Sequence, residues 1–270
     1  MFSTLNKKNS STMKKSTFLL LFLLPFFAAA QTDTVFNQLD GKGLKQGYWQ
    51  KRYPNGKVAY RAHFVDDKPL GLLVRYHENG QKLAVIDYFD DGTAFAQLFS
   101  PQGALIAEGY YRGENTKHGA WKYYRGKALV MDEQYEQGRL HGASHLYYPD
   151  GQVYERKRFK NGKLEGIYEQ IDVRGQTVFE LMYADGLQNG GVRYYYDNNQ
   201  IRIEGQHKDG VRVGEWTFYE PNGKVERKTT YTNGVAADKD EVDKKNSDYL
   251  KQMEAQRGQF IEPEDMMKEQ

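Results

Sequence analysis

Residues 214–237 read GEWTFYEPNGKVERKTTYTNGVAA, and two earlier segments repeat their pattern of glycines, aromatic residues and turn dipeptides. These are residues 142–165, GASHLYYPDGQVYERKRFKNGKLE, and residues 166–189, GIYEQIDVRGQTVFELMYADGLQN. Self-similarity at a fixed period indicates a repeat architecture. We count eight copies of this 24-residue unit between residues 47 and 237, and the third copy, around residues 92–118, is irregular.

The turn dipeptides indicate which kind of repeat this is. Asn-Gly or Asp-Gly recurs along the array, for example at 161–162, 185–186 and 209–210. Both dipeptides accept the positive φ angles that two-residue hairpin turns require. Each unit contains two such turns, so we expect the chain to reverse twice per unit and form an antiparallel meander. A parallel β-helix, whose turns would carry the chain onward, is the alternative that we rank second.

Large side chains alternate along the segments between the turns, which is typical of β-strands. Trp216 and Phe218 share one face, whereas Glu215 and Thr217 share the other. The position two residues after the first glycine is large in most copies: Trp49, Leu73, Trp121, Ser144, Tyr168, Val192 and Trp216. We therefore expect an all-β fold, an elongated single-layer antiparallel β-meander of about eight tandem 24-residue hairpins with a short C-terminal helix.

The composition excludes several classes of site. The 270 residues include no cysteine, which removes disulfide scaffolds, thiolate metal sites and cysteine nucleophiles. The formal charge is +2, but residues 1–30 hold four lysines and no acid, so the remainder has 34 basic and 36 acidic residues. A chain this close to neutrality lacks the electrostatic footprint of a nucleic-acid-binding protein.

The N-terminus predicts export. Lys14 and Lys15 precede a 13-residue apolar run, residues 18–30, that ends in three alanines. This is the order of a secretory signal peptide, and the run is short for a bilayer span, which needs about 20 residues. We expect cleavage after Ala30 and a periplasmic or secreted chain without a stable membrane span. A membrane anchor is the alternative, and either Met1 or Met13 is the start.

Four segments follow from these patterns. Residues 1–30 are the signal peptide, 31–46 an N-terminal cap strand and turn, 47–237 the repeat array, and 238–270 a charged C-terminal helix and disordered tail. The helix is expected over residues 241–254, where the apolar side chains fall at helical spacing.

The repeat pattern G-x-W-x-x-Y-x-x-N-G resembles the MORN repeat, and it is most similar to the variants grouped as YwqK-family antitoxins. The clearest matches are Gly119–Tyr124, Gly142–Gly151 and Gly214–Gly223 within a resemblance that covers residues 47–237. The resemblance implies elongated antiparallel sheets that act as interaction or scaffold modules. It brings no motif of catalytic residues.

Catalytic and metal-binding patterns are weak. His141 and His145 flank a strand start, and zinc needs three or four converging ligands. Ser144, between them, lacks the second glycine and the strand-to-helix context of a nucleophile elbow. The acidic pairs at 66–67 and 90–91 fall in turns without the ligand spacing of a calcium loop. We predict no catalytic residue, metal or cofactor.

The aromatic columns supply the candidate binding residues: Trp49, Trp121, Tyr123, Tyr194, Trp216 and Phe218. Either these rings stack against sugars or grip an extended partner, or they form the core of a sheet that has no second layer. We favour the second interpretation, because every repeat needs something to bury.

The leading hypothesis is a non-enzymatic exported protein that acts as a protein-interaction or scaffold module, with a protein partner in the cell envelope. The alternatives are a carbohydrate-binding protein that recognises an envelope glycan through an aromatic face, and an antitoxin or immunity protein. A homodimer is compatible with flat aromatic faces and unpaired sheet edges. Glycan binding needs at least two accessible tryptophan or tyrosine rings on one face.

Overall fold

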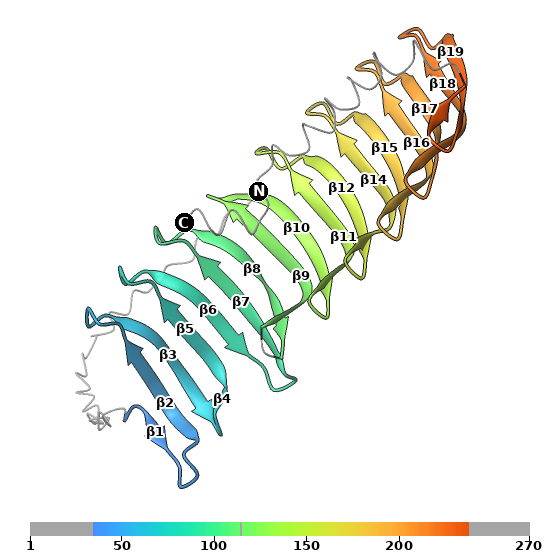
Figure 1. The fold of residues 1–270 in the computed structure, drawn as a ribbon. Coiled ribbons are helices and arrows are strands. Elements are labelled where there is room, and N and C mark those ends of the chain that lie inside the picture. Colours follow the sequence, from blue (N-terminus) through green and yellow to red (C-terminus); the bar gives the residue numbers. More distant parts are fainter. Residues whose placement is uncertain (1–34, 114, 238–270) are drawn as a thin grey trace, which may run out of the picture. The chain divides into compact units, whose positions relative to one another are not determined.

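A computed structural model describes residues 35–113 and 115–237. This part of the chain forms 20 β-strands and no helix, and so no helix that could cross a membrane. Each long strand pairs antiparallel with its neighbours in sequence, in one open sheet (Figure 1). The all-β meander is confirmed. The predicted signal peptide and C-terminal helix lie outside the described residues.

Eight hairpins follow one another along the sheet. Short strands lie at its two ends, β1 (Gln38–Leu39) and β20 (Val235–Ala236). The hairpins are β2 (Lys45–Arg52) with β3 (Val58–Val65), β4 (Lys68–Pro69) and β5 (Gly71–Tyr76) with β6 (Lys82–Tyr88), β7 (Thr93–Phe99) with β8 (Leu105–Arg112), β9 (Thr116–Arg125) with β10 (Ala128–Glu136), β11 (Arg139–Tyr147) with β12 (Val153–Lys160), β13 (Lys163–Leu164) and β14 (Gly166–Ile171) with β15 (Thr177–Ala184), β16 (Leu187–Tyr195) with β17 (Ile201–Lys208), and β18 (Val211–Tyr219) with β19 (Val225–Thr232).

The turns are of two kinds, and one of them differs from the prediction. Between repeats, Asn161 and Gly162 have φ angles of 52° and 82°, as a two-residue turn requires. Within repeats the loop has three residues: Gly56 has φ 82° and donates its N–H to the Tyr53 carbonyl at 2.9 Å. Asn55 keeps a negative φ there, and its Oδ1 accepts the Lys57 N–H at 3.0 Å. The expectation of two-residue turns is wrong for this loop, because a type I turn followed by a bulge needs a positive φ only at the glycine.

Each hairpin also carries one extra residue in its second long strand, where the pairing register shifts. The extra residues recur at a spacing of 23 or 24: Ala59, Leu83, Ile106, Val130, Tyr154, Val178, Arg202 and Glu226. Such a β-bulge bends its strand and increases the local twist. The third copy is irregular as predicted, because β6 and β7 pair without any register shift at their junction.

Backbone hydrogen bonds also join successive two-residue turns. The Gly162 N–H donates to the Leu140 carbonyl at 2.8 Å, and the Gly186 N–H donates to the Leu164 carbonyl at 2.9 Å. The same bond recurs at Gly210 with Gln188 and at Gly234 with Arg212. Each turn therefore depends on the repeat before it, which couples stability along the array.

We expect Gly162→Ala to lower the free energy of unfolding by about 1–2 kcal/mol, because an L-residue is strained in the left-handed region. A Cβ at this position would meet no atom within 4 Å, so the cost is conformational. The control is Asn161→Gly, which should be nearly neutral because glycine accepts the same φ. Urea denaturation measures both variants, and an equal loss in the two would contradict the turn assignment.

Candidate functional site on the two faces of the sheet

All six predicted binding residues lie on one side of the sheet, which we call the aromatic face: Trp49, Trp121, Tyr123, Tyr194, Trp216 and Phe218. Trp49 is partly exposed. The other five are between 0% and 6% exposed, so the protein itself covers their rings. Their role in binding a partner stays a prediction, and in this structure they form the core of a single-layer sheet.

Glycines in the preceding strand make room for two of the tryptophans. A Cβ on Gly109 of β8 would lie 2.4 Å from the Trp121 ring, and a Cβ on Gly205 of β17 would lie 2.2 Å from the Trp216 ring. Each indole therefore lies directly on the backbone of its neighbouring strand. The sequence predicted that glycines lie beside the aromatic columns, but it did not identify Gly109 and Gly205 as the glycines under the tryptophans.

A cation covers each tryptophan from its own strand. The Lys117 ammonium lies 5.0 Å from the centroid of the Trp121 ring, and the Arg212 guanidinium lies 4.9 Å from that of Trp216. Lys45 lies 5.3 Å from the ring of Trp49. Cations placed over aromatic rings are attracted by the ring quadrupole, and their aliphatic stems cover apolar surface.

Sequence reasoning missed these cations, although a signal was present. Each lies four residues before its tryptophan, with the first glycine of the repeat midway between them. Four other copies have the first glycine but no tryptophan, and none of them carries a cation at that position: they have Pro69, Leu140, Leu164 and Gln188.

Other rings close the sides of the tryptophans. Tyr111 meets Trp121 edge-to-face at 4.8 Å between centroids, and Tyr231 meets Trp216 at 5.5 Å. His207 also packs edge-to-face on Trp216, at 5.2 Å. Burial, and next the charge of Arg212, lower the pKa of His207 to about 4. The imidazole is therefore neutral at pH 7 and serves as one more ring of its column.

Two carboxylates are buried on the aromatic face, and tyrosines bind both. Tyr168 donates to Glu155 at 2.6 Å, and the Lys157 ammonium lies 2.5 Å from the same carboxylate. Tyr135 donates to Glu133 at 2.7 Å. Burial, and next the charge of Glu133, hold the pKa of Tyr123 far above its usual value. These polar groups are engaged with one another, as buried polar groups must be.

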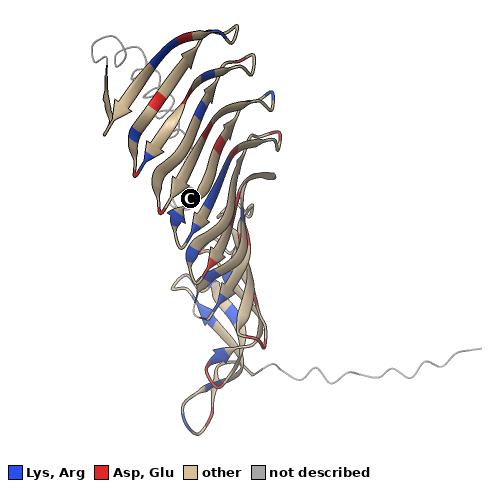
Figure 2. Cartoon of the chain, turned by 90° about the vertical axis from the view of Figure 1, so that its right-hand side faces the viewer, with Lys and Arg blue, Asp and Glu red and all other residues tan. Residues whose placement is uncertain are grey.

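The opposite side, which we call the charged face, carries a row of paired side chains that runs across the strands. The row is Glu108, Lys122, Asp132, His145, Arg156, Glu169, Glu180, Arg193, Glu204, Thr217 and Lys228. Arg156 and Glu169 form an ion pair at 2.8 Å. Acidic and basic residues are accordingly interspersed along the strands (Figure 2).

Tyrosines bind several of the acids in this row. Tyr124 donates to Glu108 at 2.7 Å and Tyr147 donates to Asp132 at 2.6 Å. Burial, and next the hydrogen bond to the carboxylate, raise the pKa of each of these two tyrosines to about 12. Tyr219 donates to Glu204 in the same way.

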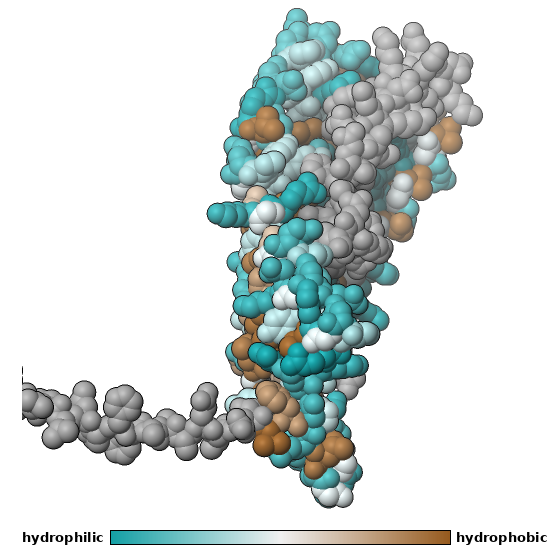
Figure 3. Space-filling model, turned by 90° about the vertical axis from the view of Figure 1, so that its left-hand side faces the viewer, coloured by the Kyte–Doolittle hydropathy of each residue, from teal (hydrophilic) through white to brown (hydrophobic). Residues whose placement is uncertain are grey.

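Exposed apolar side chains also lie on the charged face, both beside this row and on the strands that precede it. They are Tyr48, Leu72, Tyr110, Ile167 and Met182, each between 39% and 56% exposed. A space-filling view shows apolar residues in small groups among hydrophilic ones (Figure 3). Ile167 and Met182 are cross-strand partners, and contiguous apolar side chains with a polar rim are typical of protein interfaces.

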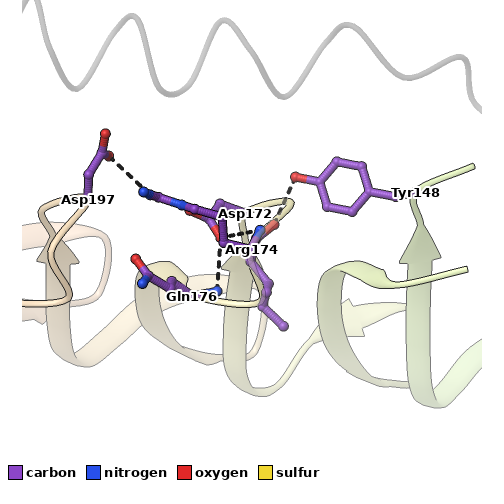
Figure 4. A network of polar contacts seen from close by, with 6 residues as sticks. Tyr148, Asp172, Arg174, Gln176 and Asp197 are labelled. Atoms are coloured by element: carbon purple, nitrogen blue, oxygen red, sulfur yellow. Dashed lines mark hydrogen bonds and ion pairs between the residues drawn. The ribbon is translucent and has the colours of Figure 1, made fainter. Parts of the chain in front are cut away.

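The edge formed by the three-residue loops carries a polar network (Figure 4). Tyr148 donates to the Ile171 carbonyl at 3.0 Å, and Arg174 donates to Asp172 at 2.6 Å. Burial raises the pKa of Asp172, but hydrogen bonds from Gln176 and Arg174 outweigh it and leave the pKa below its usual value. Asp197 lies 3.8 Å from Arg174, so this edge joins consecutive repeats.

The residues considered for chemistry do not converge. Ser144 is buried on the aromatic face, whereas His145 lies on the charged face, 3.1 Å from Asp132. Asp67 accepts the backbone N–H of Lys45 at 2.9 Å, which gives it a structural role in its turn. Within residues 35–113 and 115–237, no group of three or more His, Asp or Glu side chains could hold a metal ion.

Four segments of the chain match a known repeat family at residues 45–66, 140–161, 188–209 and 212–233. They match the MORN repeat variant. Each MORN segment begins two residues before the first glycine of a unit and contains the hairpin with its three-residue loop. The expected MORN resemblance is confirmed for these segments, and the more specific YwqK-type assignment stays a prediction. No curated protein matches the chain.

We expect Gly109→Ala to destabilise the protein by about 1–3 kcal/mol, because the added methyl overlaps the Trp121 ring. The matched control is Gly191→Ala, another strand glycine whose Cβ would meet no atom within 4 Å. Urea denaturation compares the two variants. Equal stability would show that Trp121 does not lie on the Gly109 backbone.

The depressed pKa of His207 makes stability depend on pH. The unfolded chain binds a proton near pH 6.5 and the folded chain only near pH 4, so this contribution is complete above about pH 6.5 and is lost as pH falls toward 4. His207→Phe keeps a ring against Trp216 and removes the titration. We expect the variant to lose less stability than wild type between about pH 7 and pH 4.5, measured by urea denaturation. If the difference in stability between the variant and wild type stays the same across this pH range, the lowered pKa of His207 is contradicted.

Proposed function

We propose that this chain is an exported, non-enzymatic repeat protein that binds another protein of the cell envelope through its charged face. The observation that carries the proposal is the contrast between the two faces. The rings of the aromatic face are buried in the core of the protein itself, whereas the charged face leaves apolar side chains such as Ile167 and Met182 exposed among charged residues. The match to the MORN repeat variant supports a repeat protein with a binding role.

The composition of the charged face suits protein recognition. Tyrosine, methionine and arginine are enriched at protein interfaces, and Tyr48, Tyr110, Met182 and Arg193 are all exposed on this face. Its acids and bases are interspersed, so the face as a whole has no single strong charge. We infer that a partner is recognised by matching a pattern of charges and apolar groups rather than by one electrostatic field.

The alternatives receive less support. Glycan binding through the predicted aromatic face requires two accessible rings on that face, and among the six predicted residues Trp49 alone is partly exposed. No observation favours the antitoxin or immunity role. Export is part of the proposal because of the apolar run at residues 18–30, and N-terminal sequencing of the mature chain, expected to begin at Gln31, tests it.

A photocrosslinking amino acid placed on either face tests the proposal in cells that express the full chain. Leu72 and Arg75 form the matched pair, because both are exposed in β5, with Leu72 on the charged face and Arg75 on the aromatic face. We expect a discrete adduct of one mass from position 72 and none from position 75.

The same adduct from both positions would contradict recognition by the charged face. The absence of an adduct at position 72, repeated at the exposed position Ile167 of the same face, would contradict the protein-binding role itself.

A further inference from the structure

The charged face has a hollow over the second half of the repeat array. The hollow measures about 500 Å³ and lies across strands β14 to β18, over Gly191. It arises because Gly191 has no side chain where the preceding repeats carry Ala143 and Ile167 one residue after their first glycine. A Cβ on Gly191 would meet no atom within 4 Å, so the space is open.

One wall of the hollow is apolar. Ile167 and Met182 are cross-strand partners, and they are 56% and 39% exposed. Because the two side chains adjoin each other, they form a contiguous exposed apolar patch with a polar rim, which is a mark of an interaction site. The backbone of Gly191 forms the floor, so an incoming apolar side chain can approach closely.

The rest of the rim is polar and has more acidic than basic side chains. Glu180, Glu204 and Glu215 line the hollow, against a single guanidinium, that of Arg193. Arg193 lies 3.8 Å from Glu180 and 4.0 Å from Glu204, so one cation is shared between two carboxylates at long range. Glu215 is paired with Lys228 at 2.7 Å. The site therefore favours a positive charge next to its apolar wall.

We propose that this hollow is a docking site for a partner polypeptide that presents a leucine or methionine side chain next to a lysine or arginine. The apolar side chain lies over Gly191 against Ile167 and Met182, and the basic side chain pairs with Glu180 or Glu204. This inference rests on the proposed protein-binding function and names the chemistry of the segment that is bound.

The hollow can be filled without disturbing the fold. Gly191 lies within β16, and its φ is outside the left-handed region, so valine is compatible with its backbone. The matched control is Ala143→Val, which follows the first glycine of another repeat, is exposed, and lies outside the hollow. Ile167→Ser removes one of the two side chains of the apolar wall at an exposed position and serves as the second test variant.

The probe is the peptide acetyl-Lys-Leu-Lys-amide, titrated at millimolar concentration into the isotope-labelled full chain and followed by amide chemical shifts. The comparison peptides replace leucine by serine, or both lysines by glutamate. We expect the Lys-Leu-Lys peptide to shift the Gly191 amide and its neighbours in wild type and in Ala143→Val. We expect the Lys-Leu-Lys peptide to bind Gly191→Val and Ile167→Ser at least tenfold more weakly than wild type. We expect either comparison peptide to bind wild type at least tenfold more weakly than the Lys-Leu-Lys peptide does.

Unchanged binding to Gly191→Val, or equal binding of the glutamate peptide, would overturn the proposal, and so would the absence of any shift in wild type. If Gly191→Val does not fold, Ile167→Ser decides. A crosslinked partner at Leu72 whose adduct is insensitive to Gly191→Val would leave the protein-binding function intact and refute this docking site alone.

Discussion

The fold depends on how a single-layer sheet covers its largest rings. No second layer lies over the aromatic face within the described residues, yet Trp121 and Trp216 are at most 1% exposed. Each indole is enclosed between the bare backbone of a glycine in the preceding strand and a cation from its own strand, with aromatic rings at its sides. Burial of this size is worth a few kcal/mol per ring. The cation is part of the core because its aliphatic stem replaces the missing layer.

The turns and bulges maintain this arrangement from repeat to repeat. A glycine with positive φ, such as Gly119 or Gly214, lies between each cation and its tryptophan. Residues four apart on a regular strand would be too far separated to touch, so the irregular backbone at this glycine brings the pair together. Hydrogen bonds between consecutive turns then hold neighbouring repeats in register. The aromatic face consequently forms the core, whereas the charged face remains open to a partner.

The sequence was sufficient for the fold class, because glycine columns and turn dipeptides report backbone conformation directly. It was not sufficient for the loop length: Asn-Gly at 55–56 and at 161–162 read identically but form different turns. The candidate site was only partly predictable. The aromatic columns were visible in the sequence, but the burial of their tryptophans depends on Lys117 and Arg212. On an ideal strand, a residue four positions before a tryptophan would not be expected to contact it. The hollow over Gly191 was missed because it results from an absent side chain in one repeat.

Quenching of tryptophan fluorescence by acrylamide tests most directly whether the single-layer sheet encloses its rings. The chain contains three tryptophans, and all of them lie in the described residues. We expect Trp121 and Trp216 to resist the quencher and Trp49 alone to be accessible, so that Trp49→Phe removes nearly all of the quenchable signal. Uniform quenching of all three tryptophans in the folded protein would contradict enclosure by glycine and cation.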